Sequence, residues 1–209
     1  MSRLIALLCV LMLPEAFAQP DATSLYNDLE RRYEELLSVY LAQGVCPSRT
    51  PEVVQKQQTL ARALSGVTPS AGPRVLLFAI AANSLESARR LYEAGAARMG
   101  DNGSLLHTAA RLADPPMLAY LTGVGFGIED FDGANGPALI VAVTSNRIDN
   151  ARWLLDHGAN VNATDADGGQ VLRHSFVCGD QSMVDFLVNA GAVPDALTTE
   201  LAQKLGLRL

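Results

Sequence analysis

Residues 150–169 read NARWLLDHGANVNATDADGG, an amphipathic segment followed by a loop that starts at Gly158. An apolar run, Leu139–Ala142, lies upstream, and Asn146 separates it from this segment. Two short helices and a closing loop explain this order, because glycine readily takes the left-handed backbone conformation that ends many helices. The stretch therefore predicts a helix–turn–helix unit closed by a glycine-led loop.

The same unit recurs along the chain. Its first apolar position falls at Leu76, Leu106, Leu139 and Leu172, at spacings of 30, 33 and 33 residues. The glycines that close the four copies are Gly95, Gly125, Gly158 and Gly191. A fixed period of this length indicates stacked repeats, in which each unit buries its apolar face against the next.

A period of 33 residues with two short helices and a glycine-led loop resembles the ankyrin repeat, from about Pro73 to Pro194. The resemblance implies an all-α ankyrin-repeat solenoid of about four repeats, with short hairpin finger loops between them. The chain departs from the family pattern at Pro137-Ala138, where a Thr-Pro pair is usual, and keeps the family's buried histidine only as His107. We therefore expect the fingers to be less regular than the helices.

Helical segments flank the repeat region, residues 73–194, on both sides. In residues 19–72, apolar side chains at spacings of three and four predict one helix from Ser24 to Ala42 and another from about Pro51 to Ser65. Because the end repeat of a solenoid exposes an apolar flank, we expect this pair to be an N-terminal cap. In residues 195–209, Thr198–Ala202 predicts a C-terminal capping helix.

Residues 1–18 have the pattern of a cleaved export signal. Arg3 precedes the apolar run Leu4–Leu13, and Ala16–Ala18 offers the small residues that a signal peptidase requires before Gln19. A membrane anchor is the alternative, but it needs roughly twenty apolar residues, and this run is much shorter. We expect a periplasmic protein whose mature chain has no membrane span.

Two cysteines remain in the mature chain, Cys46 in the expected cap and Cys178 in the fourth repeat. If the cap stacks on the first repeat, several helix pairs at about 9 to 10 Å each separate the two cysteines. A disulfide needs Cα atoms within about 7 Å of each other. The sequence therefore predicts that both cysteines are unpaired.

Composition and motifs point away from catalysis and from nucleic acid. The formal net charge is −6, whereas a nucleic-acid binder needs concentrated positive charge. His107, His157 and His174 stand at different repeat phases, which does not favour a metal site, and no motif groups a nucleophile with a base. Gly123–Gly127 resembles a phosphate loop but follows a helix instead of a strand. We expect no catalytic residue, cofactor or metal, although a hydrolase on this scaffold is the enzyme alternative.

The resemblance implies a protein-binding surface on the concave face, made by finger tips and inner helices. Partner-contacting residues should then lie at the variable phases of the repeat. At the fingers these are Arg98, Met99 and Asp101, then Glu129, Asp130, Phe131 and Asp132, then Thr164, Asp165 and Asp167. On the inner helices they are Arg111, Leu112, Thr144, Ser145 and Val177.

Two of these assignments have structural alternatives. Phe131, flanked by carboxylates at a finger tip, is either an anchor for a partner or a ring folded back onto its own finger. Asp101, Asp132 and Asp165 either face a partner or cap their fingers, which is the family's structural use of that phase.

These features suggest an exported binding module that is not an enzyme. In size, signal and repeat content the chain resembles periplasmic ankyrin-type immunity proteins, which block type VI secretion effectors such as phospholipases. The resemblance implies one protein partner, a secreted effector or toxin, and a monomer when free. The alternative is an accessory protein of oxidative-stress defence that associates with a catalase. Acidic fingers with an aromatic tip favour the blocking role.

Overall fold

The structure is a computed structural model that describes residues 21–44, 46–72, 74–96, 102–133 and 136–209. The expected signal, residues 1–18, lies outside this range. The helices are α1 (Ala22–Leu41), α2 (Pro51–Ala63), η2 (Pro69–Ala71), α3 (Val75–Ala81), α4 (Leu85–Glu93), α5 (Asn102–Leu112), α6 (Pro115–Gly123), α7 (Ala138–Thr144), α8 (Ile148–Asp156), α9 (Val171–His174), η4 (Ser175–Cys178), α10 (Gln181–Asn189) and α11 (Ala196–Leu205).

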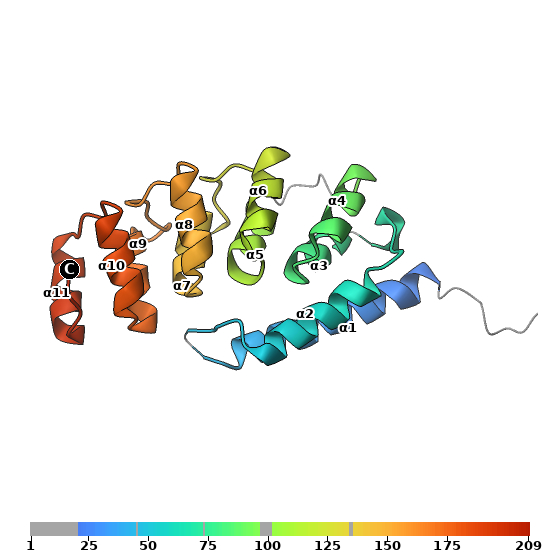
Figure 1. The fold of residues 1–209 in the computed structure, drawn as a ribbon, viewed down its shortest axis with the longest axis horizontal. Coiled ribbons are helices and arrows are strands. Elements are labelled where there is room, and N and C mark those ends of the chain that lie inside the picture. The colour runs from blue at the N-terminus through green and yellow to red at the C-terminus, as the bar shows by residue number, and fades with distance from the viewer. Residues whose placement is uncertain (1–20, 45, 73, 97–101, 134–135) are drawn as a thin grey trace, which may run out of the picture.

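Four helix pairs stack side by side, each pair holding one inner and one outer helix (Figure 1). The inner helices are α3, α5, α7 and the α9–η4 segment, and the outer helices are α4, α6, α8 and α10. Ala79, Ala109, Ala142 and Ser175 hold one phase of the inner helices, and all are fully buried. Their small size lets neighbouring inner helices approach closely. The stack of helix pairs confirms the predicted all-α solenoid.

Left-handed residues make the tight turns inside the first, third and fourth pairs. Asn83, Asn146 and Gly179 have φ values of 53°, 49° and 61°. The turns also bond to one another: Asn83 donates to Asp114 at 2.7 Å, and Asn146 donates to Asp180 at 3.3 Å. Each of these bonds joins one repeat to the next, so the turns form a polar ladder along one edge of the stack.

The finger loops lie at the opposite edge. In the third finger, the backbone pairs Thr164 with Gln170 in a single antiparallel bridge. In the second finger, the Nε2 atom of the buried His107 lies 2.6 Å from the carbonyl oxygen of Gly136. The retained family histidine thus attaches the second repeat to the finger that follows it.

The N-terminal helices form a hairpin that runs lengthwise beneath the repeats (Figure 1). The apolar stripe predicted for α1 is buried at Leu29, Tyr33, Leu36 and Tyr40. At the first repeat, the rings of Tyr26 and Tyr33 pack on Phe78, with centroids 5.8 and 5.3 Å away. Phe78 belongs to the inner helix α3, so the hairpin covers that helix.

One side chain of α2 closes the ends of two inner helices. Gln57, 2% exposed, donates to the carbonyl oxygens of Ala81 and Leu112 at 2.9 and 2.7 Å. Those residues end α3 and α5, whose last carbonyls have no partner within their own helices. Arg49 donates to the Gln57 side-chain oxygen at 3.0 Å and to both carboxylate oxygens of Asp114 at 2.6 and 2.7 Å.

The hairpin follows a row of residues that hold one phase in all four repeats. This inner row consists of Ala82, Leu112, Ser145 and Cys178. The first three are 5%, 3% and 4% exposed, and the fourth is bonded to Cys46. The hairpin therefore lies across the repeats and is not confined to the exposed flank of the first one.

The prediction that Cys46 and Cys178 are unpaired is wrong. They form a disulfide with a Cα–Cα distance of 5.1 Å across 132 residues of sequence. The prediction assumed that the N-terminal helices stack at the end of the solenoid. Because the hairpin runs along the inner row instead, its tip reaches the fourth repeat.

The C-terminal helix α11 begins two residues earlier than expected. The Asp195 side chain accepts a hydrogen bond from the Thr198 amide at 2.6 Å, which caps the helix. Thr198 and Ala202 are buried, whereas Leu197 and Leu205 are each 54% exposed. Among the described residues, no helix has both the length and the apolar character needed to cross a membrane.

We predict that Gln57→Ala lowers the free energy of unfolding by about 2 kcal/mol, because two buried carbonyl groups lose their donor. Gln58→Ala is the matched control, since Gln58 is the neighbouring, exposed residue of α2. Urea unfolding of both variants measures the difference. Equal stability of the two variants would contradict the role of Gln57 in joining the hairpin to the repeats.

Candidate functional site

The second finger presents an aromatic ring to solvent. Phe131 is 55% exposed, so the alternative in which its ring folds back onto the finger is wrong. Thr164 holds the same phase one repeat later and is also exposed. Together with the exposed Glu129 and Asp167 and the half-buried Asp132, these residues form a surface that we call the finger edge.

Two carboxylates of the second finger also hold the loop in shape. Asp130 accepts a hydrogen bond from the Gly127 amide at 3.0 Å. A Cβ atom at Gly127 would lie only 2.5 Å from the Asp130 carboxylate, so glycine is required for this approach. Glu129 accepts from the Asn160 amide at 3.0 Å, which connects the second finger to the loop after α8.

Asp165 is the structural carboxylate of the third finger. It accepts from the amides of Asp167 and Gly169 at 3.0 and 2.6 Å, and His174 Nε2 lies 2.7 Å from it. Burial alone would raise the pKa of Asp165, but the hydrogen bonds from Gly169, His174 and Asp167 hold it below its ordinary value. Of the two alternatives for Asp165, contact with a partner or capping of its own finger, the geometry supports capping.

The inner-helix candidates divide into covered and open residues. Leu112 and Ser145 are buried in the inner row, whereas Arg111 and Thr144 are half-buried and Val177 is 42% exposed. Partner contact at Leu112 or Ser145 would require the hairpin to move. Of the remaining candidates, Arg98, Met99 and Asp101 lie outside the described residues.

Tyr40 covers this part of the inner face from α1. Burial raises the pKa of its phenol, while Ser145 and the guanidinium groups of Arg111 and Arg147 act in the opposite direction. The phenol therefore lies against the second and third repeats. Arg147 also donates to the carbonyl oxygen of Ala113 at 2.6 Å.

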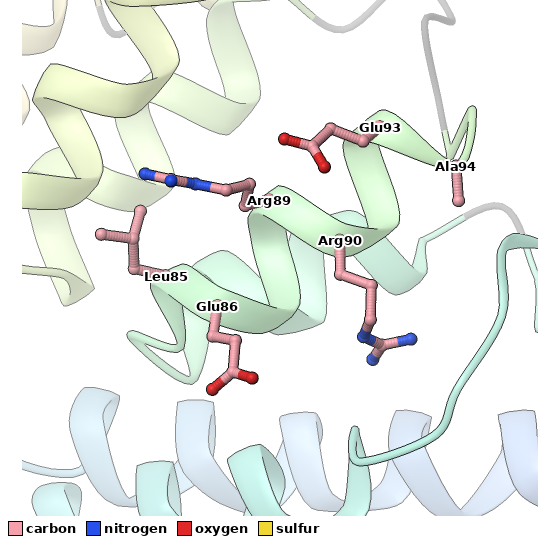
Figure 2. Close-up of a pocket in the computed structure, with 6 residues that line it drawn as sticks. All are labelled: Leu85, Glu86, Arg89, Arg90, Glu93 and Ala94. Carbon is pink, nitrogen blue, oxygen red and sulfur yellow. The ribbon is translucent and has the colours of Figure 1, made fainter.

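A shallow pocket of about 840 Å³ lies on the outer helix α4 (Figure 2). Its arginines are already engaged. Arg89 lies over the Tyr120 ring at 5.5 Å, and Arg90 donates to the carbonyl oxygens of Leu64 and Val67. The lining residues are Leu85, Glu86, Arg89, Arg90, Glu93 and Ala94, none of which is a nucleophile or a histidine.

The three histidines lie apart in the fold. His157 stacks on Trp153 at 3.8 Å, while His107 and His174 contact the second and third fingers. In the part of the chain that the structure describes, no three His, Cys, Asp or Glu side chains gather where a metal ion would bind. The most distinctive accessible feature is therefore the finger edge.

A stack of helix pairs with an exposed finger edge defines a repeat protein of the protein-binding type. The family model for ankyrin repeats matches residues 76–165 and 106–198, together more than half of the chain. The chain belongs to the ankyrin-repeat family. A search of curated proteins found no significant match.

We predict that Asp165→Ala lowers the free energy of unfolding by about 2 kcal/mol, because the third finger loses its hydrogen bonds. Asp167→Ala, at an exposed neighbour, should change it by less than about 0.5 kcal/mol. Because the pKa of Asp165 is depressed in the folded state, its carboxylate contributes fully to the free energy of unfolding at pH values above the ordinary Asp pKa. That contribution is lost as the pH falls through the folded-state pKa. Urea unfolding at pH 7 and pH 3 should therefore show the variant's deficit shrinking in acid; a constant deficit would contradict this role.

Proposed function

We propose that this ankyrin-repeat protein is an exported immunity protein, a monomer that binds and blocks one toxic effector, such as a type VI phospholipase, in the periplasm. It acts by occupying its partner and not by turnover. The observation that carries the proposal is Phe131, which is 55% exposed at a finger tip where the fold does not need an aromatic side chain. Exposed aromatic residues of this kind are frequent binding hot spots.

Export is supported by two independent features. The first eighteen residues have the composition of a cleaved signal. The Cys46–Cys178 disulfide joins distant parts of the chain, and such bonds persist in oxidising compartments such as the periplasm.

The finger edge is the surface that we assign to the effector. Its carboxylates, Glu129, Asp132 and Asp167, stand within three residues of Phe131 or Thr164 in the sequence and give the finger edge negative charge. A partner with a basic rim and an apolar pocket for one ring would complement this surface. The inner row is a less suitable site, because the chain's own hairpin covers it.

The proposal is tested by titrating the purified effector encoded beside this protein's gene with the chain from Gln19 onward. Inhibition should be complete at one-to-one stoichiometry. Protection by substoichiometric amounts, or a neighbouring catalase gene whose product binds the chain, would contradict it and favour the accessory role.

For the same complex, we predict that Phe131→Ala speeds dissociation about 30-fold, as expected for loss of about 2 kcal/mol at a buried aromatic anchor. Leu197→Ala is the matched control, because Leu197 is 54% exposed but lies on α11. Asp132→Asn should mainly slow association at low salt. Surface plasmon resonance measures both rates; unchanged dissociation for Phe131→Ala would remove this residue from the site.

A further inference from the structure

The hairpin is attached to the first two repeats by contacts that do not depend on redox conditions. Tyr26 and Tyr33 pack on Phe78, and Gln57 bonds the ends of α3 and α5. Arg49 forms an ion pair with Asp114. These contacts hold the base of the hairpin, around Tyr26 and Tyr33, and its middle, around Gln57, in place.

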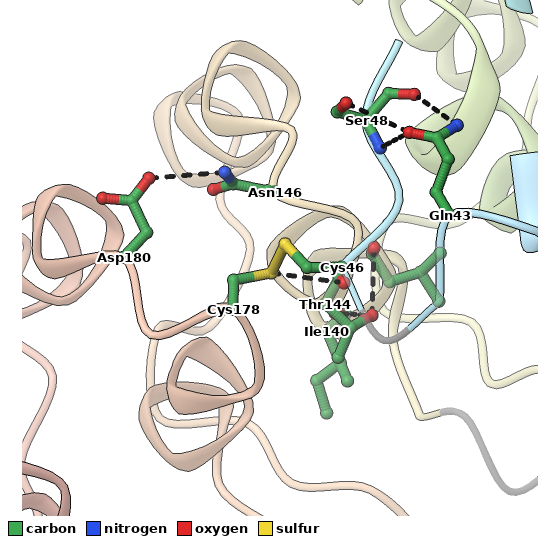
Figure 3. Close-up of a disulfide and its surroundings, with 9 residues drawn as sticks. Gln43, Cys46, Ser48, Ile140, Thr144, Asn146, Cys178 and Asp180 are labelled. Atoms are coloured by element: carbon green, nitrogen blue, oxygen red, sulfur yellow. Dashed lines mark hydrogen bonds between the residues drawn. A yellow bond between two sulfur atoms is a disulfide. The ribbon is translucent and has the colours of Figure 1, made fainter. Parts of the chain in front are cut away.

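The attachment to the third and fourth repeats is different in kind. Tyr40 is the buried side chain of this part, 1% exposed against Ser145 of the third repeat, whereas Leu41, the last residue of α1, is 58% exposed and adds little further apolar burial. The loop that follows bonds to itself: Gln43 accepts from the Ser48 amide at 3.0 Å and donates to the Ser48 carbonyl oxygen at 3.0 Å (Figure 3). The covalent link of this loop to the repeats is the bond from Cys46 to Cys178.

We propose that the Cys46–Cys178 disulfide is a redox latch on the hairpin. Its reduction releases the hairpin tip, residues 40–44 and 46–48, from the third and fourth repeats and opens the inner face there. The base of the hairpin and the repeats stay folded. The proposal goes beyond the proposed function, because it concerns the chain alone and requires no particular partner.

The chemistry needs a dithiol as the reductant. One thiolate of the dithiol attacks a cysteine sulfur, the S–S bond breaks, and the other cysteine leaves as a thiolate. The second dithiol sulfur then displaces the first cysteine, so the reagent becomes a cyclic disulfide and gives up two electrons. The two cysteine thiolates take the two protons that the dithiol releases. Both cysteines are half-buried and not fully enclosed, so a small dithiol has access to them.

The latch controls a defined part of the inner face. Ser145 is 4% exposed beneath the hairpin tip, and Thr144, next to it, has its carbonyl oxygen 3.9 Å from the Cys178 sulfur. Val177 is already 42% exposed beside this region. Release of the tip would join these residues into one open surface, whereas Leu112 would stay covered by Gln57.

Two tyrosines of α1 report on the two halves of the hairpin. Tyr40 lies at the tip and is 1% exposed; Tyr33 lies at the base and is 8% exposed. Hydroxyl-radical labelling with mass spectrometry measures the accessibility of each ring in the wild type and in Cys46→Ser/Cys178→Ser. We expect the labelling rate of Tyr40 to rise at least about fivefold in the double variant, with Tyr33 unchanged. Each single serine variant should give the same result, because each breaks the same bond.

Three outcomes would overturn the proposal. Unchanged labelling of Tyr40 would mean that the tip stays docked without the bond. A parallel rise at Tyr33, or a variant that fails to fold, would make the disulfide a general staple and not a latch. As a second measurement, wild-type protein treated with dithiothreitol and then reoxidised should regain full Tyr40 protection; failure to regain it would exclude a reversible switch.

Discussion

The crossing of the inner row by the N-terminal hairpin is the constraint on which the rest of the structure depends. Gln57 supplies the donor for the last carbonyls of two inner helices, and Arg49 reaches the polar ladder at Asp114. The Cys46–Cys178 bond then fixes the hairpin tip at the fourth repeat. A stack of repeats normally interacts only between neighbours, whereas this hairpin couples all four.

This constraint also decides which surface is left for a partner. The hairpin covers Leu112 and Ser145, so the inner face is partly filled by the chain itself. The finger loops lie at the other end of the inner helices from the inner row, and Phe131 in the second finger stays exposed there. A rigid stack that presents one aromatic ring among carboxylates suits a protein that acts by tight occupation of its target.

The repeats could be predicted because their signals are local. A glycine or asparagine with positive φ follows most of the described helices, and this conformational requirement is visible in the sequence at Asn146 and Gly158. The direction of the hairpin could not be predicted in the same way. An apolar stripe such as Leu29 and Tyr33 is compatible with two placements of the helix: stacked on the end repeat, or lying across several repeats. Cys178 stands at the inner-row phase, but this position predicts a disulfide only when the position of Cys46 in the fold is also known.

For the candidate site, repeat phase placed Phe131 at a finger tip but left open whether its ring is exposed or folded back, and it did not predict the covering of Ser145, which a distant segment supplies. The most direct test of the hairpin placement is peptide mapping of the thiol-blocked chain from Gln19 onward, digested without reduction. The structure predicts one covalently linked pair of peptides containing Cys46 and Cys178, from protein that is monomeric. Recovery of both cysteines as blocked, separate peptides would contradict it, as would a link found only between two chains.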